Sequence, residues 1–176
     1  RNIVFILYLS TMMIPITVRL IPSYNLCRNL NMLDTYMGMI LPQVAWSIPF
    51  GTFLMRQFYM GIPKQLDEAA KIDGANHFQI FWKILLPNTK SSMTTLGIYT
   101  FISAWNNLIW MLLSVRSEGK WTVTLGISSI CGASVIKQPT WNLIMGVIVI
   151  GMIPVLILFF AFQKYFMQSV AATGIK

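Results

Sequence analysis

Few residues of this chain have side chains that could do chemistry, and most of them lie in one stretch, residues 56–90. This stretch holds five of the 13 lysines and arginines and three of the five acidic residues, Asp67, Glu68 and Asp73. Carboxylates and histidine can serve as metal ligands or as general acids and bases. The sole histidine, His77, has no cysteine or acid cluster at ligand spacing, and the acids are confined to loops. We therefore predict neither a metal site nor a catalytic site.

A phosphate-binding loop is also missing from the sequence. The one Gly-Lys pair, Gly119-Lys120, is followed by Trp121, and Ser114 stands where such a loop needs its first glycine. The chain is therefore not expected to hydrolyse ATP.

Local signals divide residues 56–90 into two short helices. Pro63 suits the first position of a helix, and Gly74 can supply the left-handed residue that ends it. Asn76 can cap the second helix, with Gln79 completing a capping box. Pro87 is expected to stop this second helix. The sequence predicts a helical hairpin with a glycine turn.

Each helix of this hairpin has a distinctive face. The first helix carries mostly small side chains at spacings of three and four, at Leu66, Ala69, Ala70 and Asp73. The second carries an apolar stripe at Phe78, Phe81, Trp82 and Leu85. We expect the aromatic stripe to anchor the hairpin to the rest of the protein and the small face to point outward, which is typical of a protein-docking surface.

The elements that position this hairpin are expected to lie in a membrane. Of the 176 residues, 56% are hydrophobic and only 10% are charged, and the mean hydropathy is +0.65. A typical globular domain carries roughly a quarter charged residues. The composition excludes an ordinary soluble domain, and it excludes disorder, which needs low hydrophobicity and high charge. The net charge of +8 comes from cations spread along the chain, so nucleic-acid binding is not expected.

Four uncharged runs are long enough to cross a bilayer, which takes about 20 helical residues. We predict spans at about residues 2–21, 34–55, 91–115 and 139–163. The first span reaches residue 21 if Arg19 extends its side chain to the interface. The predicted fold class is all-α, a polytopic transmembrane helical bundle. It forms a single domain over residues 1–176, with four spans and a loop at 56–90.

A fifth uncharged run, residues 121–136, is only 16 residues long and is rich in glycine, serine and threonine. We interpret it as part of an external connection. The alternative, a fifth span, would put the two chain ends on opposite sides of the membrane. With four spans, eight cations share the side of residues 56–90 and five lie on the other side. The positive-inside rule then places residues 56–90 in the cytoplasm.

Prolines and cysteines mark further features of the predicted spans and loops. The prolines at positions 15, 42, 49 and 154 fall within spans, and we expect kinks at which a neighbouring helix or water satisfies the carbonyl that proline leaves unpaired. Cys27 and Cys131 both fall on the external side. They could form a disulfide, but we expect two free thiols.

The hairpin sequence resembles the EAA motif of permease subunits in bacterial ABC importers, E-A-A-x3-G-x9-I-x-L-P. The matching residues are Glu68, Ala69, Ala70, Gly74, Ile84, Leu86 and Pro87. Stretches at 10–22, 53–75, 103–110 and 154–176 are similar to the second permease of maltose-type carbohydrate importers. The resemblance covers essentially the whole chain. It implies a type I importer fold whose full-length relatives have six spans, so that this chain holds the last four.

The resemblance implies that residues 64–74 form a coupling helix seated in a cleft of a separate ATP-hydrolysing subunit. Closure of the ATPase pair would then tilt the bundle between inward-open and outward-open states. The residues expected to take part in coupling are Leu66, Glu68, Ala69, Ala70, Ile72, Asp73, Gly74, Ile84, Leu86 and Pro87.

The same resemblance implies a setting for the chain. The expected location is the bacterial inner membrane, as a multi-pass protein. The expected partners are a dimer of the ATPase subunit, a second permease subunit, an extracytoplasmic solute-binding protein and the lipid bilayer. ATP and magnesium would be held by the ATPase and no cofactor by this chain. The imported solute would be a sugar or a glycerol phosphate derivative.

Three residues in the middle of the third predicted span, Trp105, Asn106 and Asn107, are candidates for a substrate path. Buried amides in a membrane need partners or water, so bonding to a neighbouring helix is the alternative. Two other classes of protein also remain open. One is a membrane scaffold or channel subunit without ATP coupling. The other is a membrane-embedded lipid enzyme, which would need acids or histidines clustered at the interface.

Overall fold

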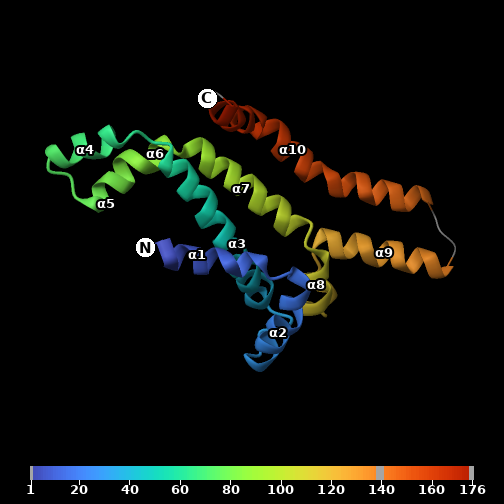
Figure 1. The fold of residues 1–176 in the computed structure, drawn as a ribbon. Coiled ribbons are helices and arrows are strands. Elements are labelled where there is room, and N and C mark those ends of the chain that lie inside the picture. Colours follow the sequence, from blue (N-terminus) through green and yellow to red (C-terminus); the bar gives the residue numbers. More distant parts are fainter. Residues whose placement is uncertain (1, 138–140, 175–176) are drawn as a thin grey trace.

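The protein is built from helices, without strands, throughout the residues that the structure describes, 2–137 and 141–174 (Figure 1). In this computed structural model the α-helices are α1 (Asn2–Ser10), α2 (Ile16–Asn29), α3 (Tyr36–Met60), α4 (Lys64–Ile72), α5 (His77–Ile80), α6 (Leu86–Asn88), α7 (Lys90–Trp105), α8 (Leu108–Ser114), α9 (Val123–Lys137) and α10 (Trp141–Gly174). Between them lie the 3-10 turns η1 (Thr11–Met13) and η3 (Glu118–Lys120) and the π-helical segment η2 (Phe81–Leu85). The predicted all-α fold class is confirmed.

Within the described residues, two helices are individually long and apolar enough to cross a membrane, α3 and the segment Trp141–Gln163 of α10. Two bent pairs of helices pass the same test when each pair is taken together, so the number of spans rises to four if each pair is one span. That upper number equals the four spans expected from the sequence. α3 also runs five residues beyond the predicted end at residue 55, so the connecting loop begins later than expected.

The first bent pair shows the break expected at Pro15, and the bend there is much sharper than a kink within one helix. The chain turns by 95° between η1 and α2. Pro15 has an extended ψ of 143°, and Ile14 before it has an extended ψ of 118°. A residue before proline is pushed out of the helical region by contact with the proline ring. Helical hydrogen bonding therefore stops there and restarts at Ile16.

The second bent pair is the predicted span 91–115, which is bent by 53° between α7 and α8. The break falls at two asparagines. The Asn106 amide donates to the Ile102 carbonyl, at 3.0 Å, at the end of α7. The Asn107 side chain accepts from the Trp110 backbone amide, at 3.3 Å, and so caps α8. Asparagine at a helix start satisfies an otherwise unpaired N–H group.

The buried core gathers where α2, α3 and α8 meet, and it includes one residue of α9. Its members are Leu20, Cys27, Met39, Trp110, Met111, Val115 and Leu125. Trp110 is fully buried and packs edge-to-face on Trp46, with ring centroids 5.2 Å apart. Both cysteines are free thiols, as predicted.

A hydrogen bond from this core replaces the backbone hydrogen bond that Pro42 removes from α3. The Trp110 Nε1–H donates to the carbonyl oxygen of Gly38 at 3.1 Å, in a buried setting. In an uninterrupted helix that carbonyl would accept from the N–H of residue 42, but residue 42 is proline, which has none. α8 therefore supplies the donor that α3 lacks, as expected for a proline in a helical bundle.

The run at residues 121–136, expected to be part of an external connection, is mostly helical and lies in α9. α9 packs along α10 (Figure 1). A Cβ atom built on Gly151 of α10 would lie 2.5 Å from the Cδ1 atom of Ile127. The absence of a side chain at Gly151 therefore lets the two helices approach closely. In a membrane bundle, small residues such as the glycines and serines of this run favour helix contacts.

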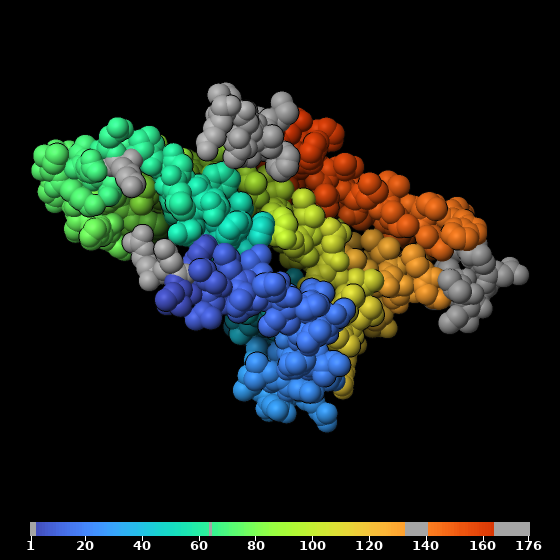
Figure 2. Space-filling view, viewed as in Figure 1, coloured from blue at the N-terminus to red at the C-terminus, as the bar shows by residue number. Residues whose placement is uncertain are grey.

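Many large apolar side chains are exposed, including several on α10, which lies along one side of the molecule (orange to red in Figure 2). Ile157 and Phe160 of α10 are 64% and 63% exposed. Monomeric soluble proteins rarely expose such continuous apolar surface. Lipid or another subunit must therefore cover these helices.

Candidate functional site

The α4–α5 hairpin projects at one end of α3 and α7, away from the core (Figure 1). Pro63 is the N-cap residue of α4, so the helix begins one residue later than expected, at Lys64. Asp67 lies in the first turn of α4, where its charge suits the positive end of the helix. It pairs with Lys71 at 2.6 Å on the exposed surface. Such an exposed i, i+4 pair contributes only about 0.3–0.5 kcal/mol.

The turn after α4 requires glycine, as the sequence predicted. Gly74 has a φ of +78°, which L-residues with a side chain rarely adopt. Its N–H donates to the Lys71 carbonyl at 3.0 Å, and the Ala75 N–H donates to the Ala70 carbonyl at 2.9 Å. These bonds satisfy carbonyls at the end of α4. A Cβ on Gly74 would meet nothing within 4 Å, so the constraint within this chain is the backbone angle, not space.

The second helix of the hairpin starts as predicted but does not end as predicted. Asn76 Oδ1 accepts from the Gln79 backbone amide at 2.8 Å, and Gln79 Oε1 accepts from the Asn76 amide at 2.9 Å, which completes the capping box. Pro87 does not stop the helix, because it lies inside the next turn, α6. The π-helical segment η2 comes just before it. A wider π turn shifts the hydrogen-bond register and helps the chain to pass a residue without an N–H group.

The expected anchoring of the aromatic stripe is found only in part, since Phe81 packs on Tyr59 of α3 with ring centroids 6.3 Å apart and Leu85 is half-buried. Phe78 is 71% exposed and Trp82 is 53% exposed, while Ile80, outside the predicted stripe, is buried. The isoleucines at positions 80 and 84, one turn apart, were the sequence signal for the inward face. The predicted small face is also divided, because Ala70 is buried while Leu66, Ala69 and Asp73 are exposed.

The residues of the EAA-like motif lie mostly on the outside of the hairpin. Glu68, Ala69, Ile72, Asp73, Gly74 and Pro87 are exposed, Ile84 and Leu86 are half-buried, and Ala70 is buried. Ile72 is 86% exposed, an unusual position for a large apolar side chain next to charged residues. The hairpin therefore exposes several large apolar side chains, those of Leu66, Ile72, Phe78, Phe81 and Trp82.

A cavity of about 660 Å³ lies between α2, α3, α7 and α8. Asn106 and Asn107, two of the three candidates for a substrate path, line it. The third candidate, Trp105, is not among the lining residues; it stacks on Phe101, with ring centroids 5.6 Å apart, and its carbonyl accepts from the Thr124 hydroxyl. The asparagine side chains bond within their own helices rather than across to a neighbour.

Sequence reasoning missed the charged member of this cavity lining, Arg19. The residue was expected to extend towards the membrane interface, but it is half-buried and lines the cavity. Its guanidinium lies over the ring of Trp46, 5.8 Å from the centroid. The one sequence signal for this role was that Arg19 is a single charge in an otherwise uncharged run.

At the end of the bundle opposite the hairpin, Asp34 ties the α2–α3 loop to the segment after α8. Its carboxylate accepts from the Ser117 hydroxyl and, at 3.0 Å each, from the backbone amides of Ser117 and Arg116. Lys120 Nζ lies 3.6 Å from Asp34 Oδ2. The Ser117 hydroxyl, the two amides and the Lys120 charge hold the pKa of the Asp34 carboxyl well below its usual range. The α2–α3 loop and the segment after α8 are thereby joined.

Bent apolar helices around a cavity that is lined by apolar and some polar side chains, together with a projecting hairpin, define a polytopic membrane subunit of the permease type. The chain belongs to the family of binding-protein-dependent transport system inner membrane components, whose sequence model matches residues 1–172. It is accordingly a multi-pass protein of the inner membrane, as the sequence predicted.

Individual relatives are likewise permease proteins of transport systems. The sn-glycerol-3-phosphate transport system permease protein UgpE of Yersinia enterocolitica is 38% identical over 170 residues, which cover 96% of this chain and 59% of that protein. The arabinooligosaccharides transport system permease protein AraQ of Bacillus subtilis is 34% identical over 176 residues, which cover 100% of this chain and 61% of that protein. The chain therefore spans about three fifths of the length of these relatives.

The fold is likewise similar to a solved structure. A chain in the crystal structure of a bacterial ABC transporter involved in the import of the acidic polysaccharide alginate superimposes with a TM-score of 0.77 and 27% identity. The match covers 94% of this chain and 62% of that chain.

Proposed function

We propose that this chain is the transmembrane permease subunit of an ATP-driven importer, in which the α4–α5 hairpin couples the bundle to a separate ATP-hydrolysing subunit. The hairpin's outer surface is the observation that supports this most. Large apolar side chains such as Ile72 and Phe78 are exposed beside charged residues. An exposed apolar patch rimmed by polar residues is typical of a protein-docking site. Glu68 and Gly74 would act at the same surface.

Contacts along α3 and α7 offer a route from the hairpin to the cavity. Tyr59, near the end of α3, packs edge-to-face on Phe81 of η2, with ring centroids 6.3 Å apart. Farther from the hairpin, Phe50 of α3 packs on Tyr99 of α7, the helix that follows η2 and α6 in the chain, with ring centroids 4.4 Å apart. Phe50 and Tyr99 also line the cavity. A displacement of the hairpin would therefore move two walls of the cavity, which is what alternating access requires.

The remaining parts of the proposal concern topology and partners. Residues 1–176 form one transmembrane domain with four spans. These are the bent pair α1–α2, α3, the bent pair α7–α8 and the Trp141–Gln163 segment of α10, and the α4–α5 hairpin lies in the cytoplasm. ATP and magnesium bind to a dimer of the partner ATPase, and this chain binds no cofactor. A second permease subunit and an extracytoplasmic solute-binding protein complete the assembly.

The solute is proposed to be small and rich in hydroxyl groups. The relatives are named for the transport of sn-glycerol 3-phosphate and arabinooligosaccharides, and the solved neighbour is described as importing alginate. All three compounds carry several hydroxyl groups or sugar rings. The cavity lining, with serine, threonine, tyrosine and amide side chains, suits such a solute.

Substitution of Ile72 tests the coupling proposal. Ile72→Asp would place a charge at the proposed docking surface, and burying an unpaired charge costs several kcal/mol. We expect the full-length chain to insert normally while the amount of ATPase subunit that co-purifies falls by at least about tenfold. Ile72→Val, which keeps the apolar character, is the matched control and should retain the ATPase.

Two results would count against the proposal. Equal ATPase recovery from Ile72→Asp and the parent would mean that the hairpin is not the docking surface. If the unmodified protein retains no ATPase at all, a scaffold or channel subunit without ATP coupling becomes the better interpretation.

A further inference from the structure

We propose that the cavity between α2, α3, α7 and α8 binds a polyhydroxylated solute that carries an anionic group, phosphate or carboxylate, and that Arg19 binds this group. The inference rests on the proposed function, because it gives the permease a solute site. It goes further in assigning a charge to the solute and a recognition residue to this chain.

The cavity has the size and chemistry of a small-molecule site. Its volume is about 660 Å³, within the range of roughly 300–1,000 Å³ found for ligand pockets. Polar side chains come from three of its walls: Arg19 from α2, Gln43 and Ser47 from α3, Tyr99, Thr100 and Ser103 from α7, and Asn106 and Asn107 from the bend. Trp46 and Phe50 add aromatic surface, against which the apolar face of a sugar or polyol can pack.

Arg19 is the single charged residue among the described residues that line this cavity. Its Nε atom is buried and has no hydrogen-bond partner. The acidic residues of the sequence, at positions 34, 67, 68, 73 and 118, all lie outside the lining. A half-buried cation whose inner nitrogen has neither a counter-charge nor an acceptor loses part of its hydration without compensation. An anionic group in the cavity would supply both the missing charge and the missing acceptor.

The Arg19 guanidinium lies against an aromatic wall of the cavity. It lies over the ring of Trp46, 5.8 Å from the centroid, a favourable cation–π arrangement. Trp46 in turn packs on the fully buried Trp110. Arginine held in one orientation loses little conformational freedom on binding, and its planar donors match phosphate and carboxylate oxygens.

The other polar groups of the cavity complement the hydroxyls of such a solute. The hydroxyl groups of Ser47 and Thr100 donate to carbonyls of their own helices, those of Val44 and Leu96. The Gln43 amide nitrogen likewise donates to a carbonyl of its own helix at 3.1 Å. The oxygens of these side chains keep free lone pairs, so they can accept from solute hydroxyls while Arg19 donates to the anion.

Direct binding to the intact importer assembly, purified in detergent without the solute-binding protein, tests this inference by calorimetry. The probes form two matched pairs, sn-glycerol 3-phosphate with glycerol and glucuronate with glucose. We expect the unmodified assembly to bind at least one charged probe about tenfold or more tightly than its neutral counterpart. The charged probe with the greater preference identifies the anion as phosphate or carboxylate.

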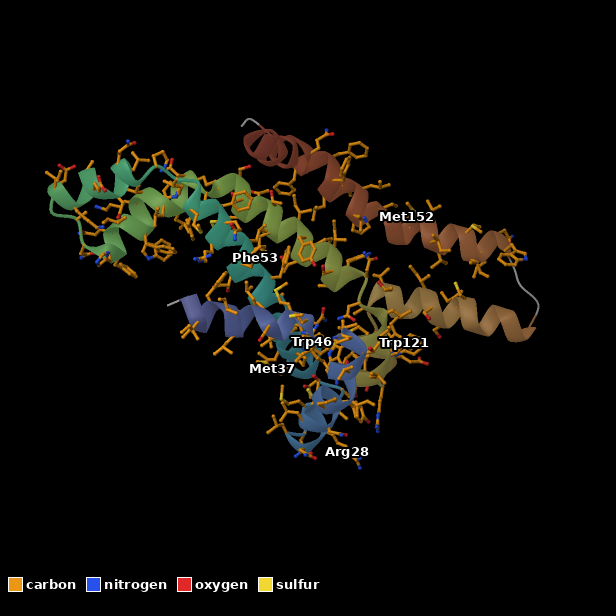
Figure 3. All side chains as sticks on the ribbon, in the orientation of Figure 1. Arg28, Met37, Trp46, Phe53, Trp121 and Met152 are labelled. Atoms are coloured by element: carbon orange, nitrogen blue, oxygen red, sulfur yellow. The ribbon has the colours of Figure 1, made fainter. Side chains whose placement is uncertain are left out.

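Variants then assign the preference to Arg19. Arg19→Gln should abolish it, with a loss of about tenfold or more for the charged probe and little change for the neutral one. Arg19→Lys, which keeps the charge, should retain part of the preference. The matched control is Arg28→Gln, because Arg28 is exposed at the far end of the same helix, away from Trp46 (Figure 3).

The result that overturns the inference is equal affinity, or no measurable affinity, of the unmodified assembly for charged and neutral probes. This comparison needs no variant, so it decides the matter even if Arg19→Gln does not assemble. Equal losses for both probes in Arg19→Gln would also overturn it, since they would indicate a structural role. An assembly that retains its ATPase and hydrolyses ATP but shows no charge preference refutes this inference alone, whereas loss of the ATPase would refute the proposed function.

Discussion

Replacing Trp110 with phenylalanine tests whether α8 supplies the hydrogen-bond donor that Pro42 removes from α3. Trp110 is fully buried, and its Nε1–H lies 3.1 Å from the Gly38 carbonyl oxygen. Phenylalanine keeps an aromatic ring but removes the donor, which leaves a buried carbonyl unpaired at a cost of about 1–3 kcal/mol. The smaller ring adds about 1 kcal/mol of lost packing. We expect the free energy of unfolding to fall by about 2–4 kcal/mol.

A second substitution separates the hydrogen bond from the packing. Pro42→Ala restores an N–H group at the position that would bond to Gly38 in a regular helix. In that background Trp110→Phe should lose packing but leave the carbonyl paired. The double-mutant cycle is therefore expected to show a coupling free energy of about 1 kcal/mol.

The measurement is unfolding of the purified protein in mixed micelles by titration with SDS. Trp82→Phe is the matched control, because Trp82 is 53% exposed on the hairpin, and it should change the free energy of unfolding by less than about 0.5 kcal/mol. If Trp110→Phe costs the same in the parent protein as in the Pro42→Ala variant, the interhelical bond does not compensate for the proline, and the reasoning fails.

Two further predictions concern α3 and the loop before it. A Cβ on Gly38 would lie 2.0 Å from the Met32 carbonyl oxygen, whereas a Cβ on Gly97 of α7 would meet nothing within 4 Å. Gly38→Ala should therefore destabilise the protein by about 1–3 kcal/mol, while Gly97→Ala should be neutral or slightly stabilising. Similar melting temperatures for the two variants would contradict this prediction. The lowered pKa of Asp34 means that its contribution to stability is complete at neutral pH and is lost as pH falls below the ordinary value of 3.8. In Asp34→Asn, hydrogen exchange of the amides at 116–117 should be faster at pH 7, and the stability difference from the parent should shrink as pH is lowered from 5 to 2; a difference independent of pH would refute the role of the carboxylate.

Local features of the hairpin were predictable because short-range chemistry decides them. The positive φ of Gly74 follows from a turn that must close a helix within one residue. The capping box of Asn76 and Gln79 depends on two side chains three residues apart. Both were confirmed because no distant part of the chain is needed to form them.

The orientation of the hairpin faces was not predictable in the same way. The spacing of Phe78 and Trp82 predicts an apolar stripe, but it does not identify the surface against which the stripe packs. The structure buries Ile80 instead and leaves the aromatics exposed. A hydrophobic stripe in a membrane subunit can face its own bundle, lipid or another protein, and periodicity alone does not distinguish these environments.

The sequence by itself determined that this is a helical membrane protein with a polar hairpin, because the lengths of uncharged runs and the EAA-like spacing are properties of the linear chain. Only the tertiary structure decided how the helices break and what the breaks create. Ile16, just after the bend at Pro15, and Asn106 and Asn107, at the second bend, line one cavity. The burial of Arg19 against Trp46 and the bond from Trp110 to Gly38 join residues far apart in the chain. Such pairings depend on how helices pack in three dimensions, which no local pattern encodes.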